Sequence, residues 1–258
     1  MMPSLPAAFL HHPIAHRALH DRSARRPENS LPAIRAAVAA GYGIEIDLQP
    51  SADGVAMVFH DDTLDRLTAA TGPISARSAA ELQAIGLTDC DEGIPTLAQV
   101  LSEIGGRVPL LIEIKDQSGT MGPTDGVLEN AAASALAGYA GPVAVMSFNP
   151  SSVAHMARLS PTIARGLTTY AFPASDFSRP LGPELKTHRK SLAAIADFDR
   201  VGASFISHHW RDLNRPRVAE LKAAGAAILC WTIRSPAEEA QARTIADNIT
   251  FENYLARQ

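Results

Sequence analysis

The sequence predicts a (β/α)8 barrel, in which eight parallel strands form a closed cylinder and helices cover its outside. Three observations favour this fold. Short apolar runs rich in β-branched residues alternate with alanine-rich segments that have helical apolar spacing. Eight such runs are present, and helix boundary signals lie between them. A chain of 258 residues can bury a sizeable core, so we expect a single barrel domain over residues 1–258.

The expected strands follow one another along the whole chain. Each is a mostly apolar run of four to seven residues between turn-forming residues. In chain order they cover residues 14–17, 43–48, 55–60, 110–115, 143–148, 163–168, 205–208 and 227–233. Because helix-like segments lie between such runs, the sheet that they form should be parallel and closed.

The segments between the strands carry helix starts and helix ends. Capping residues open three of them, at Thr96, Asn149 and Ser235. Glycines, which readily end a helix, close three of them, at Gly41, Gly105 and Gly225. These local signals agree with the apolar periodicity, so we expect helices around the barrel.

One connection is longer than the usual turn between a strand and the next helix. Residues 61–95 separate the third expected strand from the helix that follows Thr96. Within them, Ser78 and Glu81 have the spacing of a capping box. We therefore expect a small insertion after the third strand, at one end of the barrel. Residues 116–126 and 170–190 are expected to form loops at the barrel mouth.

Charge and composition exclude several classes of protein. The net charge of -4 is spread over both halves without long blocks of one sign, so no basic face for nucleic acid is expected. The two cysteines, Cys90 and Cys230, lack zinc-site spacing, and we expect no disulfide. No run approaches the length of a membrane span, and residues 1–10 lack the features of a signal peptide. We expect a cytoplasmic protein without stable membrane insertion, and its oligomeric state is not predicted.

Polar residues stand at the ends of four expected strands, where a buried strand would ordinarily carry valine, isoleucine or leucine. They are His16 and Arg17, Glu45 and Asp47, His60 and Asp61, and Glu113 and Lys115. Because side chains alternate along a strand, Glu45 shares a face with Asp47, and Glu113 shares a face with Lys115. In a barrel, these polar faces point inward.

The inward acids predict a bound cation. Burying an unpaired carboxylate costs roughly several kcal/mol for each ion, and a divalent cation at Glu45, Asp47 and Glu113 would remove that cost. Oxygen ligands favour magnesium or calcium, with manganese as a third option. The alternative is a network of salt bridges with Arg17 and Lys115. Three acids against two bases leave one acid in excess, which favours the metal.

The remaining polar residues fit an anionic substrate. Beside a cation, Arg17 and Lys115 predict an anionic ligand such as a phosphate. Histidine titrates near neutrality, so His16 and His60 could supply one general base and one general acid. These groups together suit the cleavage of a phosphodiester, which needs charge neutralisation, an activated nucleophile and a protonated leaving group.

Short motifs along the chain resemble those of the glycerophosphodiester phosphodiesterases. The motifs are His16-Arg17, Pro27-Glu28-Asn29-Ser30, Glu45-Ile46-Asp47, FHDDTLDR at residues 59–66, Glu113-Ile114-Lys115, Ser147-Phe148 and Trp231-Thr232. Each is short, and their order over residues 14–252 is more specific than any one of them.

The resemblance implies a barrel with an insertion after the third strand, a metal at the three acids, and catalytic roles for His16 and His60. It also implies that the arginine and lysine named above hold the phosphate, while Trp231 and Phe148 line the glycerol side of the pocket. The reaction would be hydrolysis of a small glycerophosphodiester to sn-glycerol 3-phosphate and an alcohol. Such an enzyme would belong to glycerol and lipid metabolism.

Several alternatives stay open at the level of sequence. Glu28 and Asn29 either cap the following helix or orient Arg17, and Asp61 has the same two interpretations. Either histidine could be the base, and the nucleophile is water or a substrate hydroxyl that passes through a cyclic phosphate. The substrate could instead be a lysophospholipid or a sugar phosphodiester. A catalytically silent barrel that binds a phosphorylated metabolite is the alternative outside enzymes.

Three stretches depart from the family pattern, and one of them is the motif at residues 27–30, which ends in Ser30. Ala18 stands where the family usually has glycine after the histidine and arginine. We expect its Cβ to narrow the pocket or shift the backbone beside His16, which bears on the choice of substrate. Residues 247–252 form a weak version of the family's C-terminal motif.

Overall fold

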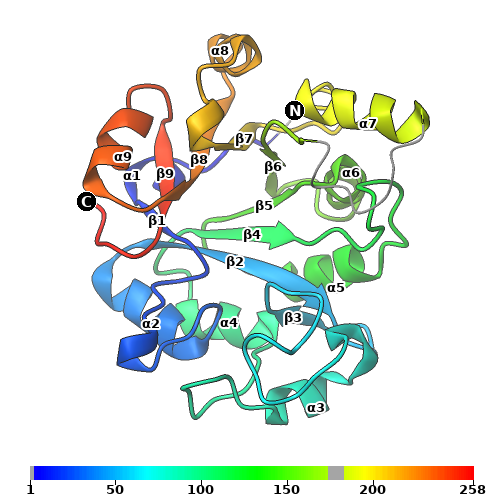
Figure 1. Ribbon diagram of the computed structural model, residues 1–258, viewed down its shortest axis with the longest axis vertical. Helices are drawn as coiled ribbons and strands as arrows, with labels where there is room; N and C mark the ends of the chain where they lie inside the picture. Colours follow the sequence, from blue (N-terminus) through cyan, green and yellow to red (C-terminus); the bar gives the residue numbers. More distant parts are fainter. Residues whose placement is uncertain (1–2, 174–182) are drawn as a thin grey trace.

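The computed structural model describes residues 3–173 and 183–258 (Figure 1). Eight strands form a closed cylinder in which every neighbouring pair is parallel, and the first strand pairs with both the second and the last. The eight are β1 (Ile14–Ala15), β2 (Gly43–Pro50), β4 (Leu110–Ile114), β5 (Val143–Ser147), β6 (Ala164–Thr169), β7 (Phe205–His209), β8 (Ala227–Ile233) and β9 (Asn248–Phe251). The predicted (β/α)8 barrel is therefore confirmed.

The structure places one predicted barrel strand outside the cylinder and adds one strand that was not predicted. Residues 55–60 contain β3 (Ala56–Val58), but β3 pairs antiparallel with β2 and lies outside the cylinder. The five residues between β2 and β3 cannot span the crossover that a parallel pair requires. The eighth barrel strand is β9, which the sequence analysis did not identify as a strand. Its inward residues Asn248 and Thr250 are polar, so the sequence of β9 lacks the apolar run that predicts a buried strand.

Helices cover the outside of the barrel, as Figure 1 shows. They are α2 (Leu31–Ala40), α4 (Leu97–Ile104), α5 (Val127–Leu136), α6 (Pro150–Leu159), α7 (Pro183–Ala193), α8 (Pro216–Ala223) and α9 (Pro236–Ala242). Thr96, Asn149 and Ser235 cap their helices through side-chain acceptors, as predicted. In the described part of the chain, no helix is long and apolar enough to cross a bilayer.

The expected mouth loop at residues 170–190 is only partly a loop. Helix α7 begins at Pro183, so residues 183–190 of that stretch are helical. Residues 174–182 lie outside the described residues. The other expected loop, residues 116–126, does connect β4 to α5 without regular structure and is organised around Asp116, which accepts hydrogen bonds from Ser118 and Met121.

The insertion after β3 has its own apolar core. It contains α3 (Ala79–Ala84), whose start carries the predicted capping box of Ser78 and Glu81. Its buried side chains are Met57, Phe59, Leu64, Leu67, Ile74, Ala79, Leu82, Leu87 and Ile94. A large apolar side chain contributes about 1.5–3 kcal/mol when fully buried. The insertion, on one side of the barrel in Figure 1, can therefore hold a fixed shape of its own.

The barrel interior is apolar at one end and polar at the other. Short helix α1 (Ala8–His11) places Phe9 against inward side chains of the strands. That inner core consists of Phe9, Ile14, Leu111, Ala144, Met146, Ala164, Phe205 and Leu229. The Asn248 side chain donates to the backbone oxygens of Phe9 and His12 at 2.7 and 2.6 Å. These bonds hold α1 as a plug at the apolar end of the barrel. The polar residues gather at the opposite end.

Candidate active site

A cavity of about 230 Å³ opens at the carboxyl ends of the barrel strands. In (β/α)8 barrels this is the end at which active sites are built. The residues that line it are His16, Arg17, Glu45, Asp47, His60, Glu113, Lys115, Met146, Phe148, Thr168, Trp231, Thr232, Arg234 and Thr250. The structure therefore brings the predicted acids, bases, histidines and aromatic residues together around one space.

Three buried carboxylates form a cluster in the wall of the cavity. Each of Glu45, Asp47 and Glu113 offers an oxygen, and these oxygens lie within 4.8 Å of one another. Strand register explains the cluster, because Asp47 of β2 pairs with Glu113 of β4 and Glu45 lies two residues earlier on the same face. Burial raises the pKa of Glu45 well above its ordinary value, and the charges of the other two acids add to this.

Lys115 neutralises only part of this charge. Its Nζ atom lies 2.7 Å from Asp47 Oδ1 and 2.5 Å from Glu113 Oε1. Burial disfavours the charged lysine, but the two carboxylates outweigh burial and raise its pKa. Burial likewise opposes ionisation of Asp47, yet its basic neighbours, Lys115 first among them, lower its pKa. Glu113 remains less readily ionised, because burial raises its pKa despite Lys115.

Glu45 is the acid that lacks a basic partner. Its Oε2 atom accepts a hydrogen bond of 2.8 Å from the backbone N–H of Arg17. In residues 3–173 and 183–258, no lysine, arginine or histidine forms an ion pair with it. A buried carboxylate with a single neutral donor is unfavourable, and its environment suits a cation. The donor set is all oxygen, so these three residues fit a hard divalent ion.

Each histidine of the cavity is held by a carboxylate. The Nδ1 atom of His16 lies 2.6 Å from Glu252 Oε2, and Nδ1 of His60 lies 2.7 Å from Asp61 Oδ1. An ionised carboxylate only accepts, so Nδ1 carries the proton in both rings and Nε2 is left as the basic nitrogen. Burial lowers the pKa of both histidines, although Glu252 opposes this at His16 and Asp47 opposes it at His60.

The segment before α2 organises the arginine and the acids. Ser30 caps α2 by accepting from the Ala33 N–H, so Glu28 and Asn29 do not serve as caps. The Asn29 amide donates to Asp47 Oδ2 at 2.9 Å, and Glu28 Oε1 accepts from Arg17 Nη1 at 2.7 Å. Glu28 therefore contacts Arg17, as one of the two interpretations expects, whereas the Asn29 side chain contacts Asp47.

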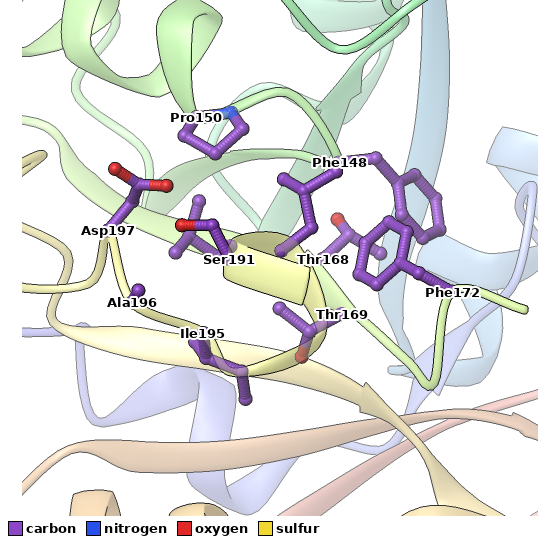
Figure 2. A pocket seen from close by; sticks show the side chains of 11 residues that line it. Phe148, Pro150, Thr168, Thr169, Phe172, Ser191, Ile195, Ala196 and Asp197 are labelled. Atoms are coloured by element: carbon purple, nitrogen blue, oxygen red, sulfur yellow. The ribbon is translucent and has the colours of Figure 1, made fainter. Parts of the chain in front are cut away.

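Two aromatic side chains, Phe148 and Trp231, also line the cavity. Phe148 makes edge-on contacts with Tyr170 and Trp231, at ring-centroid distances of 5.6 and 5.5 Å. Phe172 packs against Tyr170 at 4.1 Å. Figure 2 shows Phe148 and Phe172 beside a second, small apolar cavity of about 10 Å³ that lies between β6 and α7. Trp231 is fixed by donating from Nε1 to the Ser207 backbone oxygen at 2.9 Å.

Comparison with known proteins decides the family. A sequence profile described as the glycerophosphoryl diester phosphodiesterase family matches residues 16–250. The chain belongs to this family. YhdW of Bacillus subtilis, provisionally assigned as a glycerophosphodiester phosphodiesterase, is 29% identical over 231 residues, which are 86% of each chain. Human glycerophosphodiester phosphodiesterase 1 is 35% identical over 113 residues, only 40% of this chain and 33% of that protein.

Solved structures of similar fold include phosphodiesterases, in agreement with the sequence profile. A phosphodiesterase of Oleispira antarctica, solved in complex with its product sn-glycerol 3-phosphate, superposes with a TM-score of 0.75 at 26% identity, covering 96% of this chain and 95% of that one. A glycerophosphodiester phosphodiesterase of Parabacteroides distasonis gives a TM-score of 0.70 at 21% identity, over 92% and 91% of the two chains. The second likeness supports the fold alone.

Three polar residues of this glycerophosphoryl diester phosphodiesterase family member were not assigned a role from sequence. Glu252 holds His16, Arg234 lines the cavity and donates from Nε to Glu252 Oε1 at 2.7 Å, and Arg66 joins Asp61 to Glu28. Alternation would have revealed Glu252, since it continues the polar face of β9 after Thr250. Arg66 lies in a quoted motif, but its partners come from distant parts of the chain.

Ala18 does not narrow the cavity as the sequence suggested. Its φ of 67° retains the left-handed conformation that glycine favours, and its N–H donates to the Glu45 backbone oxygen at 2.9 Å. The residue is buried but lines a separate groove with Leu19 and Phe251, not the cavity of His16. Ala18 is therefore not a lining residue of the cavity that contains His16.

His60 lies in the predicted site but not on a barrel strand. It follows β3, which belongs to the antiparallel hairpin with β2. The hairpin brings residue 60 back over the end of β2, where the Gln49 side chain donates to the His60 backbone oxygen at 3.2 Å. His16, by contrast, directly follows β1 as expected, so the two histidines reach the cavity from different layers of the structure.

Proposed function

We propose that this chain hydrolyses glycerophosphodiesters to sn-glycerol 3-phosphate and an alcohol with the help of a divalent cation. The observation that carries the proposal is that two histidines, each paired with a carboxylate at Nδ1, line the same cavity as three buried acids. Family membership supports the reaction class. Because cavity residues come from both ends of the described chain, we also propose that residues 1–258 act as one catalytic domain, with the insertion at about residues 61–95.

The proposed cation is held by Glu45, Asp47 and Glu113. Their oxygen donors favour magnesium or calcium, with manganese as the third option. When bound, such an ion would offset negative charge on the phosphoryl oxygens. The excess negative charge of Glu45 is the main support for the ion, because Lys115 and Arg17 pair with other carboxylates.

Arg17 and Lys115 are proposed to hold the phosphate. Both line the cavity and carry several N–H donors, and a guanidinium can bind two phosphate oxygens at once. The Arg17 guanidinium is kept in one orientation by Glu28 and by Asp47, whose Oδ2 lies 3.6 Å from its Nε. A phosphate bound there would face donors that are already in place, which lowers the cost of reaching the transition state.

The histidines are proposed to move protons at Nε2. One accepts the proton of the nucleophile as a new P–O bond forms, and the other donates a proton to the leaving alkoxide as the old P–O bond breaks. The nucleophile is water, or a hydroxyl of the substrate that forms a cyclic phosphate before water opens it. In this scheme Glu252 and Asp61 fix the tautomers of His16 and His60 and so keep Nε2 available.

A lysophospholipid is the second candidate substrate. The observation that favours it is that two aromatic rings in edge-on contact at 5.5 Å, Phe148 and Trp231, line the cavity and offer apolar surface to a substrate. A substrate panel separates the two. Glycerophosphodiesters should be cleaved with the higher kcat/KM under the first proposal, and lysophospholipids under the second.

The test is a phosphate-product assay with and without a chelator. We expect activity to disappear after exhaustive metal removal and to return with magnesium, calcium or manganese. His16→Ala and His60→Ala should each lower kcat by about 10²- to 10⁴-fold, since proton transfer by a positioned side chain contributes that much. His11→Ala, which changes an exposed histidine outside the cavity, is the matched control. Full activity without metal, or in both cavity variants, would overturn the proposal.

A further inference from the structure

Arg66 lies between two carboxylates and binds both with two hydrogen bonds. Its Nε and Nη2 atoms donate to Asp61 at 2.6 and 2.9 Å. Its Nη1 and Nη2 atoms donate to Glu28, both at 2.8 Å. A guanidinium is planar and rigid, so it fixes the position of one carboxylate relative to the other.

Each of these carboxylates holds a residue that lines the cavity. Asp61 accepts from Nδ1 of His60 at 2.7 Å, and Glu28 accepts from Nη1 of Arg17 at 2.7 Å. One side chain that does not line the cavity therefore connects a histidine of the site to the arginine of the site. The connection uses four carboxylate oxygens, and no other arginine in the described residues joins two cavity residues in this way.

The two ends of this connection belong to different parts of the fold. Arg66 and His60 are in or beside the insertion, which has its own apolar core, whereas Arg17 and Glu28 lie in the segment between β1 and α2. Arg66 therefore connects the insertion, which begins just after His60, to the segment that carries Arg17.

Other ion pairs connect the same two parts of the fold but are more exposed. Arg22 with Asp89 and Arg25 with Asp91 have side chains that are all at least 50% exposed. An exposed pair of this type contributes little to stability. Glu28, in contrast, is 13% exposed, and Arg66 meets it with both terminal nitrogens.

We propose that Arg66 is a positioning residue for the phosphodiester reaction, acting through Asp61 on His60 and through Glu28 on Arg17. This inference rests on the proposed function, because it assumes that His60 transfers a proton and that Arg17 holds the phosphate. Lysine at position 66 keeps the charge but offers no planar pair of donors to each carboxylate. Charge alone is therefore insufficient for the role.

The experiment compares Arg66→Gln and Arg66→Lys with Arg35→Gln as the matched control. Arg35 has the same exposed fraction as Arg66, 47%, and pairs with Glu92 of the insertion, but none of its partners touches a cavity residue. We expect Arg66→Gln to lower kcat by about 10- to 100-fold with a smaller change in KM, since small displacements of reacting groups cost that much. Arg66→Lys should recover only part of the loss, and Arg35→Gln should stay within about twofold of the unchanged protein.

A second readout does not depend on turnover. Nitrogen NMR of the His60 ring should show the proton on Nδ1 in the unchanged protein and a mixture of tautomers in Arg66→Gln. The affinity for sn-glycerol 3-phosphate, measured by calorimetry, should fall in the same variant because Arg17 loses its fixed orientation. Thermal unfolding of all three variants tests whether they are folded. If Arg66→Gln does not fold, the same measurements are made on Arg66→Lys.

The outcomes separate this inference from the proposed function. If the unchanged protein cleaves no glycerophosphodiester, the proposed function fails, and the tautomer and affinity measurements then decide the role of Arg66. A His60 tautomer and a product affinity that are the same in Arg66→Gln and Arg35→Gln would overturn the inference. A loss of kcat no larger than that of Arg35→Gln would overturn it too.

Discussion

The Nδ1 atom of His16, just after the first barrel strand, lies 2.6 Å from Oε2 of Glu252, just after the last. The same carboxylate accepts from Arg234 Nε at 2.7 Å, so it binds a histidine and an arginine of one cavity. Burial opposes its ionisation, but His16, His20 and Arg234 outweigh burial and lower the pKa of Glu252 far below its ordinary value. The carboxylate is thus ionised at any pH at which the protein would be assayed.

Replacement of Glu252 should impair catalysis without unfolding the protein. In Glu252→Gln the fixed negative charge is lost, so the His16 ring can adopt either tautomer and its protonated form is less stabilised. We expect kcat to fall by about 10- to 100-fold, as for other groups that orient a site histidine. Steady-state kinetics measure this, with Glu220→Gln as the control, because Glu220 is exposed and Arg217 is its one ion-pair partner among the described residues. Equal kcat values in the two variants would contradict the role of Glu252.

Glu45 should make the metal-free protein less stable as the pH rises. Its folded-state pKa is raised above the unfolded value of about 4.3, so its contribution is fully present below that pH and is lost as the pH increases. Glu45→Gln cannot ionise, and its stability relative to the unchanged protein should therefore increase from pH 5 to pH 8. Urea unfolding in the presence of a chelator tests this. Parallel pH profiles would show that the charge of Glu45 is already compensated.

The same substitution should have the opposite effect on activity. Glu45→Gln removes one proposed metal ligand, and even residues that only orient a metal ligand cost about 10- to 100-fold when replaced. We expect metal-supported kcat/KM to fall by more than about 100-fold. A variant that is more stable without metal but nearly inactive with it would match a site built for a cation. Retained activity in Glu45→Gln would argue against that site.

His208 should make the protein lose stability in mild acid. It is fully buried, with Nδ1 at 2.7 Å from Thr169 Oγ1, and burial lowers its pKa to about 4. Because the unfolded pKa is about 6.5, the unfolded chain binds more protons between these values, and stability falls as the pH drops from 6.5 to 4. The full effect is at most about 3 kcal/mol. The His208→Gln variant should show a shallower slope in this window, and an unchanged slope would exclude His208 as its source.

Ala18→Gly should stabilise the protein. A non-glycine residue in the left-handed region destabilises the folded state by about 1–2 kcal/mol, and glycine removes this strain. Glycine also raises the conformational entropy of the unfolded chain, which offsets about 0.4–1 kcal/mol of the gain. We expect a net gain of about 0.5–1 kcal/mol in denaturant unfolding, with unchanged substrate preference because Ala18 lies outside the cavity. Ala36→Gly, in the middle of α2, is the control and should destabilise by a similar amount. A loss of stability in both variants would show that the left-handed conformation of Ala18 does not destabilise the protein.

Much of the site could be predicted because alternation along strands is a strong rule. Glu45, Asp47 and Glu113 were predicted to share the barrel interior from period two alone, and the structure places them in one cluster. His60 was assigned to the right cavity for an incorrect reason, since its strand is the return arm of a hairpin. The short connection between β2 and β3 favours the hairpin, whereas the apolar composition of β3 is equally typical of a barrel strand.

The missed parts have different physical causes. Strand β9 is half polar because its inward residues Asn248 and Thr250 meet the plug and the cavity, so composition hides it. Because β9 was not predicted, the alternation of side chains along it could not be used to predict that Glu252 points toward the cavity. The contacts of Arg66 join residues up to 38 positions apart through side chains, and no local pattern predicts such a meeting.

The pairing of β1 with β9 also has a consequence for synthesis. A chain emerging from the ribosome has Glu45, Glu113 and both histidines long before β9 is made, yet His16 meets its carboxylate only when β9 closes the cylinder. The contact between His16 and Glu252 should therefore form in one step, when β9 pairs with β1, and not grow gradually with chain length.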